Sequence, residues 1–237
     1  EMSDKLELVR KDDAETAGLI RSKFAIPQQV VSIENSSVLI VDDLGRRWRL
    51  PLGDKAYTSL TNEGQLRICR EVATERDLFS CMGTFYELPA ENADGYAKIR
   101  PVSTHNYRIN DYASYRGMLV LTGVNPEEGK DNEHVIVSND GKAAVLVGVI
   151  DDLWQLGKPL GKGGPWKDTS VKAGIPSDPY LIGFYDRKKL TLSHQSADDI
   201  TFTIEADPTG NGDWMEYMVR KVKAGEKWTY EFPAEFQ

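Results

Sequence analysis

The sequence is short of cations and has no long apolar run. Its 237 residues include 29 lysines and arginines against 37 aspartates and glutamates, which gives a formal net charge of −8 at pH 7. An acidic chain binds the nucleic-acid backbone poorly, because that backbone attracts basic surfaces. No apolar stretch reaches the roughly 18 residues that a membrane-spanning helix needs. We therefore expect neither a nucleic-acid partner nor a membrane span.

Histidine is also scarce. The three histidines, His105, His134 and His194, are far apart, and the spacings CxxC, HExxH and HxH do not occur. These are the spacings at which side chains of one loop or helix commonly hold zinc. The sequence therefore predicts no metal site and no cofactor, although its acidic loops leave a calcium ion open.

Only two cysteines are present, Cys69 and Cys81, placed symmetrically about Glu75. A hairpin turn at 74–76 would bring the two thiols near each other, so a disulfide is conceivable, but two separately packed thiols are the favoured interpretation. Neither a GxSxG nucleophile elbow nor a GxxxxGK[ST] phosphate loop occurs, which disfavours serine or cysteine hydrolysis and phosphate binding.

Apolar residues with a period of two dominate what remains. Hydrophobic residues make up 40% of the chain, enough for a core. Many alternate with polar residues, as Ile200, Phe202 and Ile204 do, and this alternation is typical of strands. The strand-like segments are 29–34, 38–41, 46–50, 65–72, 78–88, 99–102, 117–124, 134–138, 143–150, 180–185, 190–194, 200–206, 214–222 and 227–232. Only 13–20 and 151–156 favour a helix, so the sequence predicts an all-β protein.

Groups of three or four strands recur about every 40–50 residues, which matches the blades of a β-propeller. We therefore expect propeller-like blades over residues 1–198. A C-terminal antiparallel hairpin unit is expected over 199–237, where 214–222 would pair with 227–232. This unit would be a closing blade or a small sandwich.

Two loops carry local signals. Asp140-Gly141 predicts the tip of a hairpin, because glycine accepts the positive φ of a tight turn. Residues 157–179 are rich in glycine and proline and too long for a routine connection, so a functional loop is indicated.

The densest polar stretch, Ser103–Arg116, lies between two strand-like segments. Its candidate site residues are His105, Arg108, Asp111, Tyr115 and Arg116. Histidine and aspartate can exchange protons, so His105 and Asp111 are candidate acid/base groups. Arginine clamps carboxylates, and tyrosine offers a ring and a hydroxyl, so the other three would bind substrate. Equally open is a buried hydrogen-bond network between blades.

The glycine-rich loop contributes Trp166, Lys167 and Asp168. A tryptophan on such a loop can stack on a sugar ring, and its charged neighbours can bind hydroxyls; alternatively, Trp166 anchors the loop. For the adjacent Asp151 and Asp152, capping of a short helix is favoured over catalysis, because neighbouring carboxylates rarely converge.

Four longer motifs resemble a known group of proteins. They are CMGTFYELP (81–89), IRPVSTHNYRINDYASYRGMLVLTGV (99–124), VIVSNDGKAAVLVGVIDDLWQLGKP (135–159) and GGPWKDTSVKAGIPSDPYL (163–181). Together they resemble a family of predicted secreted bacterial β-propeller proteins from polysaccharide-degrading bacteria, similar to sialidase- and arabinanase-like propellers. The resemblance implies an extracellular or periplasmic location, a carbohydrate ligand, and a chain that is part of a longer propeller. It supplies no catalytic residues.

The leading hypothesis is therefore a secreted carbohydrate-active protein, glycoside hydrolase-like or lyase-like, acting on an acidic or plant or microbial polysaccharide. The polar stretch would line its pocket, and the Trp166–Asp168 loop would lie at the mouth. The alternatives are a non-catalytic glycan-binding module and a propeller that binds proteins.

Overall fold

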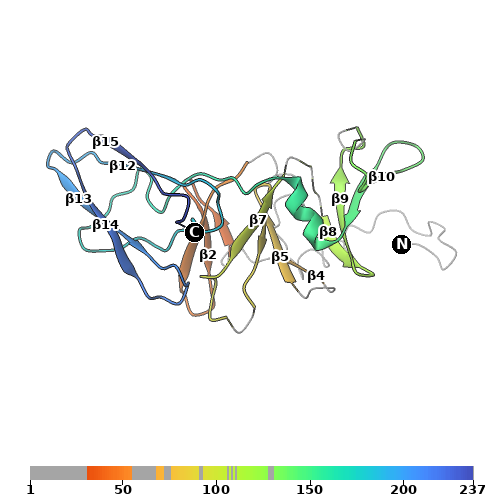
Figure 1. Ribbon diagram of the computed structural model, residues 1–237, viewed down its shortest axis with the longest axis horizontal. Coiled ribbons are helices and arrows are strands. Elements are labelled where there is room, and N and C mark those ends of the chain that lie inside the picture. Colours follow the sequence, from red (N-terminus) through yellow and green to blue (C-terminus); the bar gives the residue numbers. More distant parts are fainter. Residues whose placement is uncertain are drawn as a thin grey trace.

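A computed structural model describes most of the chain after residue 30. The described residues are 31–54, 68–71, 76–90, 93–105, 107, 109, 111–127 and 131–236. Within them lie fifteen antiparallel strands in five small sheets and one short 3-10 helix. The all-β prediction is thus confirmed, while the helix predicted at 13–20 falls outside the described residues. The sheets follow one another along the long axis of the molecule (Figure 1).

The first two sheets are meanders. The first contains β1 (Val31–Ile33), β2 (Val38–Val41) and β3 (Arg47–Leu50). The second contains β4 (Ile68–Glu71), β5 (Arg76–Cys81), β6 (Thr84–Glu87) and β7 (Arg100–Thr104). Each strand pairs with the next one along the chain. Close spacing of strand-like segments and polar turns predicted the first of these meanders. In the second, the single strand predicted at 78–88 is instead the hairpin of β5 and β6, which turns at Met82 and Gly83, both with a positive φ. The segment at 99–102, expected to begin the next group of strands, belongs to β7 of this sheet.

The third sheet departs from a simple meander. It contains β8 (Asp111–Tyr115), β9 (Met118–Val124), β10 (Val135–Val137) and β11 (Ala144–Gly148) in the order β10-β11-β9-β8. The predicted hairpin between β10 and β11 is confirmed, and Gly141 at its tip has a φ of 69°. The 3-10 helix η1 (Ile150–Leu156) follows β11, where the sequence favoured a helix.

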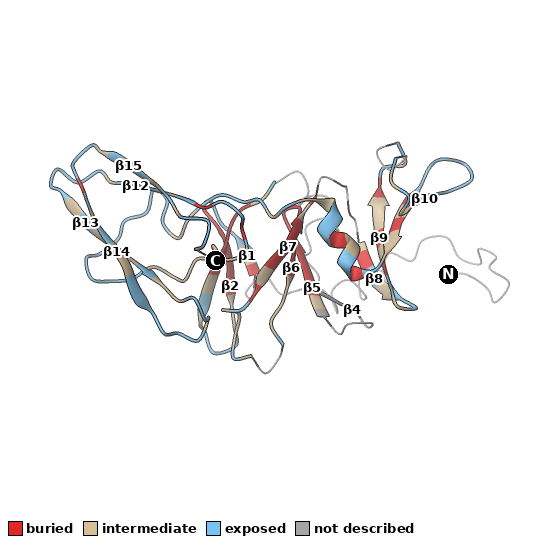
Figure 2. Cartoon of the chain, in the orientation of Figure 1, coloured by how far each residue is buried: buried red, intermediate tan, exposed pale blue. Residues whose placement is uncertain are grey.

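Both faces of the second sheet are buried, which makes it the centre of a stack. Leu78 and Phe79 are neighbours in β5 and therefore point to opposite faces. Leu78 packs in one apolar cluster with β8, β9, β11 and η1, whereas Phe79 packs in the other with β2 and β3. Phe85 and Tyr86 in β6 divide in the same way. Figure 2 shows this buried centre, and three sheets thus pack face to face around two cores.

A tyrosine from the polar stretch ties the second and third sheets together. The Tyr112 hydroxyl accepts a hydrogen bond from the Ser80 backbone nitrogen at 3.0 Å and lies 3.5 Å from the Leu78 carbonyl oxygen. Its ring meets Phe85 edge-on, with 5.4 Å between the centroids. Part of this stretch therefore bonds sheet to sheet, as one of the two open interpretations expected.

The C-terminal strands pair differently from the prediction. They are β12 (Lys189–Ser193), β13 (Ile200–Ala206), β14 (Met215–Val222) and β15 (Lys227–Glu231), and β12 pairs with β15 while β13 pairs with β14. The predicted pairing of 214–222 with 227–232 is therefore wrong. The Asp207 carboxylate accepts hydrogen bonds from the backbone nitrogens of Thr209, Gly210 and Gly212, which closes the β13–β14 hairpin. The turn before β15 instead leads into the other sheet.

These two sheets fold against each other. The hydroxyls of Tyr217 in β14 and Tyr230 in β15 lie 2.9 Å apart, and Tyr217 also meets the Phe236 ring with centroids 4.7 Å apart. Most of their residues are half-buried or exposed (Figure 2). β12 belongs to this unit by pairing, although it precedes residue 199; the division into two domains stays a prediction.

The long connection from Gly157 to Lys188 runs back to the first sheet. Lys162 forms an antiparallel bridge with Leu52, and Tyr180 forms a parallel bridge with Arg49. The strand predicted at 180–185 is thus reduced to one bridge, because its partner is the edge of β3 rather than a neighbouring hairpin strand.

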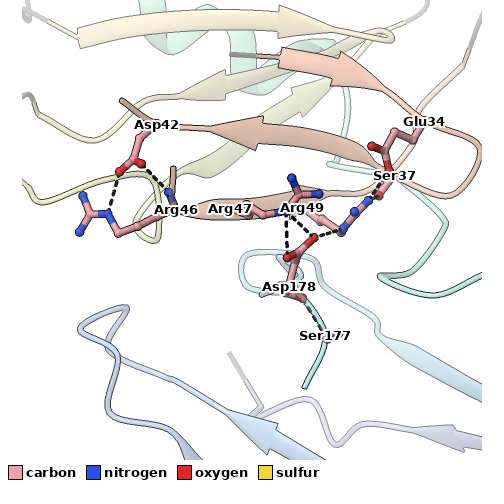
Figure 3. A network of polar contacts seen from close by, with 8 residues as sticks. All are labelled: Glu34, Ser37, Asp42, Arg46, Arg47, Arg49, Ser177 and Asp178. Atoms are coloured by element: carbon pink, nitrogen blue, oxygen red, sulfur yellow. Dashed lines mark hydrogen bonds and ion pairs between the residues drawn. The ribbon is translucent and has the colours of Figure 1, made fainter. Parts of the chain in front are cut away.

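A buried arginine holds this connection in place (Figure 3). The Arg49 guanidinium donates to the Asp178 carboxylate, to the Glu34 carboxylate and to the Ser37 hydroxyl, each at 2.7 Å. Arg47 also contacts Asp178, at 3.2 Å. These bonds satisfy the buried charge and fasten residues far apart in the sequence.

The two cysteines do not face each other. Cys69 pairs in register with Leu78, and Cys81 pairs with Thr84. Cys81 is a free, buried cysteine whose pKa is raised to about 12 by burial. The separate-thiol interpretation holds for Cys81.

Candidate functional site

A pocket lies beside η1, next to the loop that precedes β10. Its volume is about 500 Å³. The polar side chains in its wall belong to Tyr107, Asp131, Asn132, Glu133, His134, Asp152 and Gln155, and Leu146 and Leu156 add apolar surface. A pocket of this size suits a small ligand or a single sugar unit.

The loop before β10 positions His134. The Asn132 side-chain oxygen accepts a hydrogen bond from the His134 backbone nitrogen at 2.9 Å, which forms a local turn. The His134 Nδ1 then lies 3.2 Å from the Val147 carbonyl oxygen and 3.8 Å from Asp152 Oδ2. Because a carbonyl only accepts, Nδ1 carries a proton in this contact.

The start of η1 positions Asp152. Its Oδ2 accepts a hydrogen bond from the Val149 backbone nitrogen at 2.7 Å, so the expected capping role is confirmed for this aspartate. Gln155 lies one turn later, with its Nε2 at 3.5 Å from Asp152 Oδ1. A Cβ on Gly148 would collide with the Asp152 carboxylate, so this arrangement needs glycine there.

Tyr107 forms another part of the wall and comes from the polar stretch. Its hydroxyl accepts a hydrogen bond from Asn132 Nδ2 at 3.1 Å. Behind it, the Nδ1 of His105 donates to the Tyr107 carbonyl oxygen at 3.1 Å. His105 is only 3% exposed, and burial lowers its pKa from 6.5 to about 4. It is therefore a neutral side chain that supports Tyr107 from inside.

The other predicted residues of the stretch lie along β8. Asp111 begins the strand and accepts a hydrogen bond from the Tyr112 backbone nitrogen at 2.9 Å. Tyr115 ends it, about 13 Å further on at about 3.3 Å a residue, and Arg116 lies in the following turn. The Arg116 guanidinium lies over the Tyr115 ring, 5.4 Å from its centroid. Both side chains are exposed, whereas Arg108 lies outside the described residues.

Trp166, Lys167 and Asp168 lie on the connection from Gly157 to Lys188, which runs back along the first sheet. Just before them, the Gly164 backbone nitrogen donates to the Ser36 carbonyl oxygen at 3.0 Å. Trp166 is 39% exposed, and its two neighbours are exposed as well. This loop is thus fastened to the first sheet, whereas the pocket opens beside the third. The role of these residues in ligand binding stays a prediction.

The pocket is acidic. Among the described residues that line it, Asp131, Glu133 and Asp152 contribute three carboxylates, and none is a lysine or an arginine. Within the described ranges, no group of three or more His, Cys, Asp and Glu side chains is arranged to hold a metal ion. No helix of the described chain is long and apolar enough to cross a membrane.

Searches for similar proteins match no family model, no curated protein and no solved structure. The site must therefore be judged from its own chemistry. Sequence reasoning did not single out Asn132, Glu133 and His134 as a site. The signal that could have found them is a compact Asn-Glu-His segment directly before a strand, at the edge of a sheet.

Proposed function

We propose that the protein is a carbohydrate-binding β protein and that its glycan site is the pocket beside η1. The observation that carries this proposal is a cavity of about 500 Å³ that combines amides, carboxylates and a tyrosine. The Asn132 and Gln155 amides can each donate and accept, as sugar hydroxyls require. Tyr107 adds a ring that can lie against the apolar face of a sugar.

The proposed scaffold is a propeller-like stack, part of a longer protein exported from the cell. The face-to-face packing of the first three sheets supports it, because propeller blades cover one another in this way. The strand order of the third sheet departs from a blade meander. Export rests on the family resemblance of the sequence.

The charge of the pocket bears on the class of sugar. The described lining residues include three carboxylates and no lysine or arginine, a charge that repels a uronate and favours a neutral or amino sugar. An acidic sugar, as the sequence led us to expect, would have to bind near Arg116 instead. The pocket therefore favours a neutral or amino sugar, whereas the surface near Arg116 favours an acidic one.

Glycoside hydrolysis is the second candidate function. It uses two carboxyl groups on either side of a glycosidic oxygen. Glu133 and Asp152 come from different elements and line the same cavity, which favours this candidate. Asp152 is held by a backbone hydrogen bond, so it is the better ordered of the two.

A glycan array probed with single variants tests the proposal. It should include neutral, amino and uronate-containing oligosaccharides. We expect binding of a neutral or amino sugar that weakens at least tenfold in Glu133→Gln or Gln155→Ala and is unchanged in the matched control Trp166→Ala. The reverse pattern, or binding of uronates alone, would refute the pocket as the glycan site. Release of reducing ends that is lost in Asp152→Asn would add catalysis.

A further inference from the structure

The β13–β14 ribbon leaves a long strand edge open. Within the described residues, these two strands form a sheet of their own, and β14 pairs with no strand other than β13, while the Val222 carbonyl oxygen at its end accepts a hydrogen bond from His194 at 3.0 Å. A free edge presents unpaired backbone N–H and C=O groups to any other strand. Two-stranded sheets are also marginal by themselves, so a further strand would stabilise this one.

The outward face of β14 combines one exposed apolar residue with charges on both sides. Val219 is 51% exposed. The register passes from Ile204–Met218 to Glu205–Glu216, so Tyr217 is an extra residue and Glu216 takes the outward position next to Val219. Lys221 takes the outward position on the other side. The face therefore presents an acid, a valine and a base in order.

Two acidic residues lie side by side on this face. Glu205 and Glu216 are paired across the strands, and both are exposed. Like charges directly opposite each other destabilise a sheet. A cation placed beside Glu216 would relieve the repulsion. Lys221 cannot do so within one chain, because it lies further along the same strand and contacts Asp199 at 3.0 Å.

We propose that β14 pairs edge to edge with β14 of a second copy of the chain. When the two strands run antiparallel with Val219 opposite its counterpart, each Glu216 falls opposite Lys221 of the other copy. The two-fold axis passes between the valines, and two Glu–Lys pairs flank it. The four strands then form one continuous sheet. A lysine has three donors, so Lys221 serves Asp199 and the second copy together.

The self-association of the chain and its charge dependence test this pairing. One strand edge is a small interface, so we expect a weak dimer in sedimentation velocity at about 100 µM. Glu216→Lys should weaken the dimer at least tenfold, because it places two lysines opposite each other. Glu216→Lys combined with Lys221→Glu restores complementary pairs and should restore the dimer. A wild type that stays monomeric at about 1 mM, or a charge reversal without effect, would overturn the proposal.

Cysteine cross-linking gives a second, geometric test. Val219→Cys should form a disulfide-linked dimer under mild oxidation, because the two side chains meet at the axis. Thr203 lies beside Val219 on β13 and is the matched control. Two Thr203→Cys side chains would be about 14 Å apart, three strand spacings, and should not link. Cross-linking of Thr203→Cys in place of Val219→Cys would show that the other edge pairs and would exclude the proposed register.

Discussion

His105 should make the folded protein sensitive to mild acid. Its ring is 3% exposed, lies 5.2 Å from the Phe85 ring between centroids, and has a pKa lowered from 6.5 to about 4 by burial. The folded state therefore prefers the neutral ring, whereas the unfolded chain takes up the proton near its ordinary pKa. Stability contributed by this group is fully present above pH 6.5 and is lost as the pH falls toward 4.

The size of this loss follows from the two pKa values. Between them, the unfolded state binds one more proton than the folded state, and each pH unit changes the free energy of unfolding by about 1.4 kcal/mol. Linkage over this interval gives a loss of about 2 kcal/mol at pH 5 and about 3 kcal/mol at pH 4. That is a large share of the stability of an ordinary domain.

Urea unfolding of the wild type and of His105→Asn, measured from pH 7.5 to pH 4, isolates the contribution of the histidine. Asparagine can keep the hydrogen bond to the Tyr107 carbonyl oxygen but cannot gain a proton. The variant is expected to be less stable at pH 7.5, because the smaller side chain leaves space in the core. Its free energy of unfolding should fall less with acid than that of the wild type, by about 2 kcal/mol at pH 5 and about 3 kcal/mol at pH 4.

Parallel stability curves for the two proteins would refute this reasoning. A histidine NMR titration provides the direct check, since the His105 ring signals of the folded protein should remain those of neutral imidazole at pH 5.5. Protonation of that ring near pH 6.5 in the folded state would show that His105 is hydrated rather than buried.

Three further predictions concern other parts of the chain. Arg49→Ala removes the bonds to Asp178, Glu34 and Ser37 and should lower the free energy of unfolding by about 1–3 kcal/mol in urea titrations, because the buried Ser37 hydroxyl loses this donor and the half-buried Asp178 keeps only Arg47 among its described partners. Gly148→Ala should displace the Asp152 carboxylate and weaken glycan binding at least tenfold by calorimetry, with the circular dichroism spectrum unchanged. Peptide mapping after iodoacetamide treatment at pH 8 should find Cys81 unmodified in the folded protein and modified in urea, because burial raises its pKa to about 12.

Most strand positions were predictable from the sequence because alternation is a local signal, whereas β8, within the polar stretch, and the turn inside 78–88 were not. The hairpin around Gly141 and the short helix after β11 were predicted from turn and capping residues a few positions away. Strand partners were harder. The period of two marks 214–222 and 227–232 as strands, but it does not say that a turn between them leads into another sheet. The bonds of Asp207 decide that pairing.

The candidate pocket was only partly predictable, for a similar reason. Tyr107 and Asp152 belong to segments that the sequence marked as polar or acidic, yet their partners are distant in the chain. Asn132 reaches Tyr107 across 25 residues, and His134 approaches Asp152 from another element. Spacing along a sequence cannot show such contacts. The sequence also suggested that His105 is a catalytic group in an open pocket, whereas the packing of two sheets buries its ring.

The bond between Arg49 and Asp178 joins positions 129 residues apart. On a ribosome, the first sheet emerges long before the carboxylate that completes it. Until then, the guanidinium has Glu34 and Ser37 as its partners among the described residues, both from the hairpin of its own sheet. The first sheet is therefore synthesised early but gains the Asp178 contact late, and forming a contact that closes so long a loop is slow. A nascent chain stopped before Asp178 should hold a protease-sensitive first sheet, so this ion pair marks the point at which synthesis has passed residue 178.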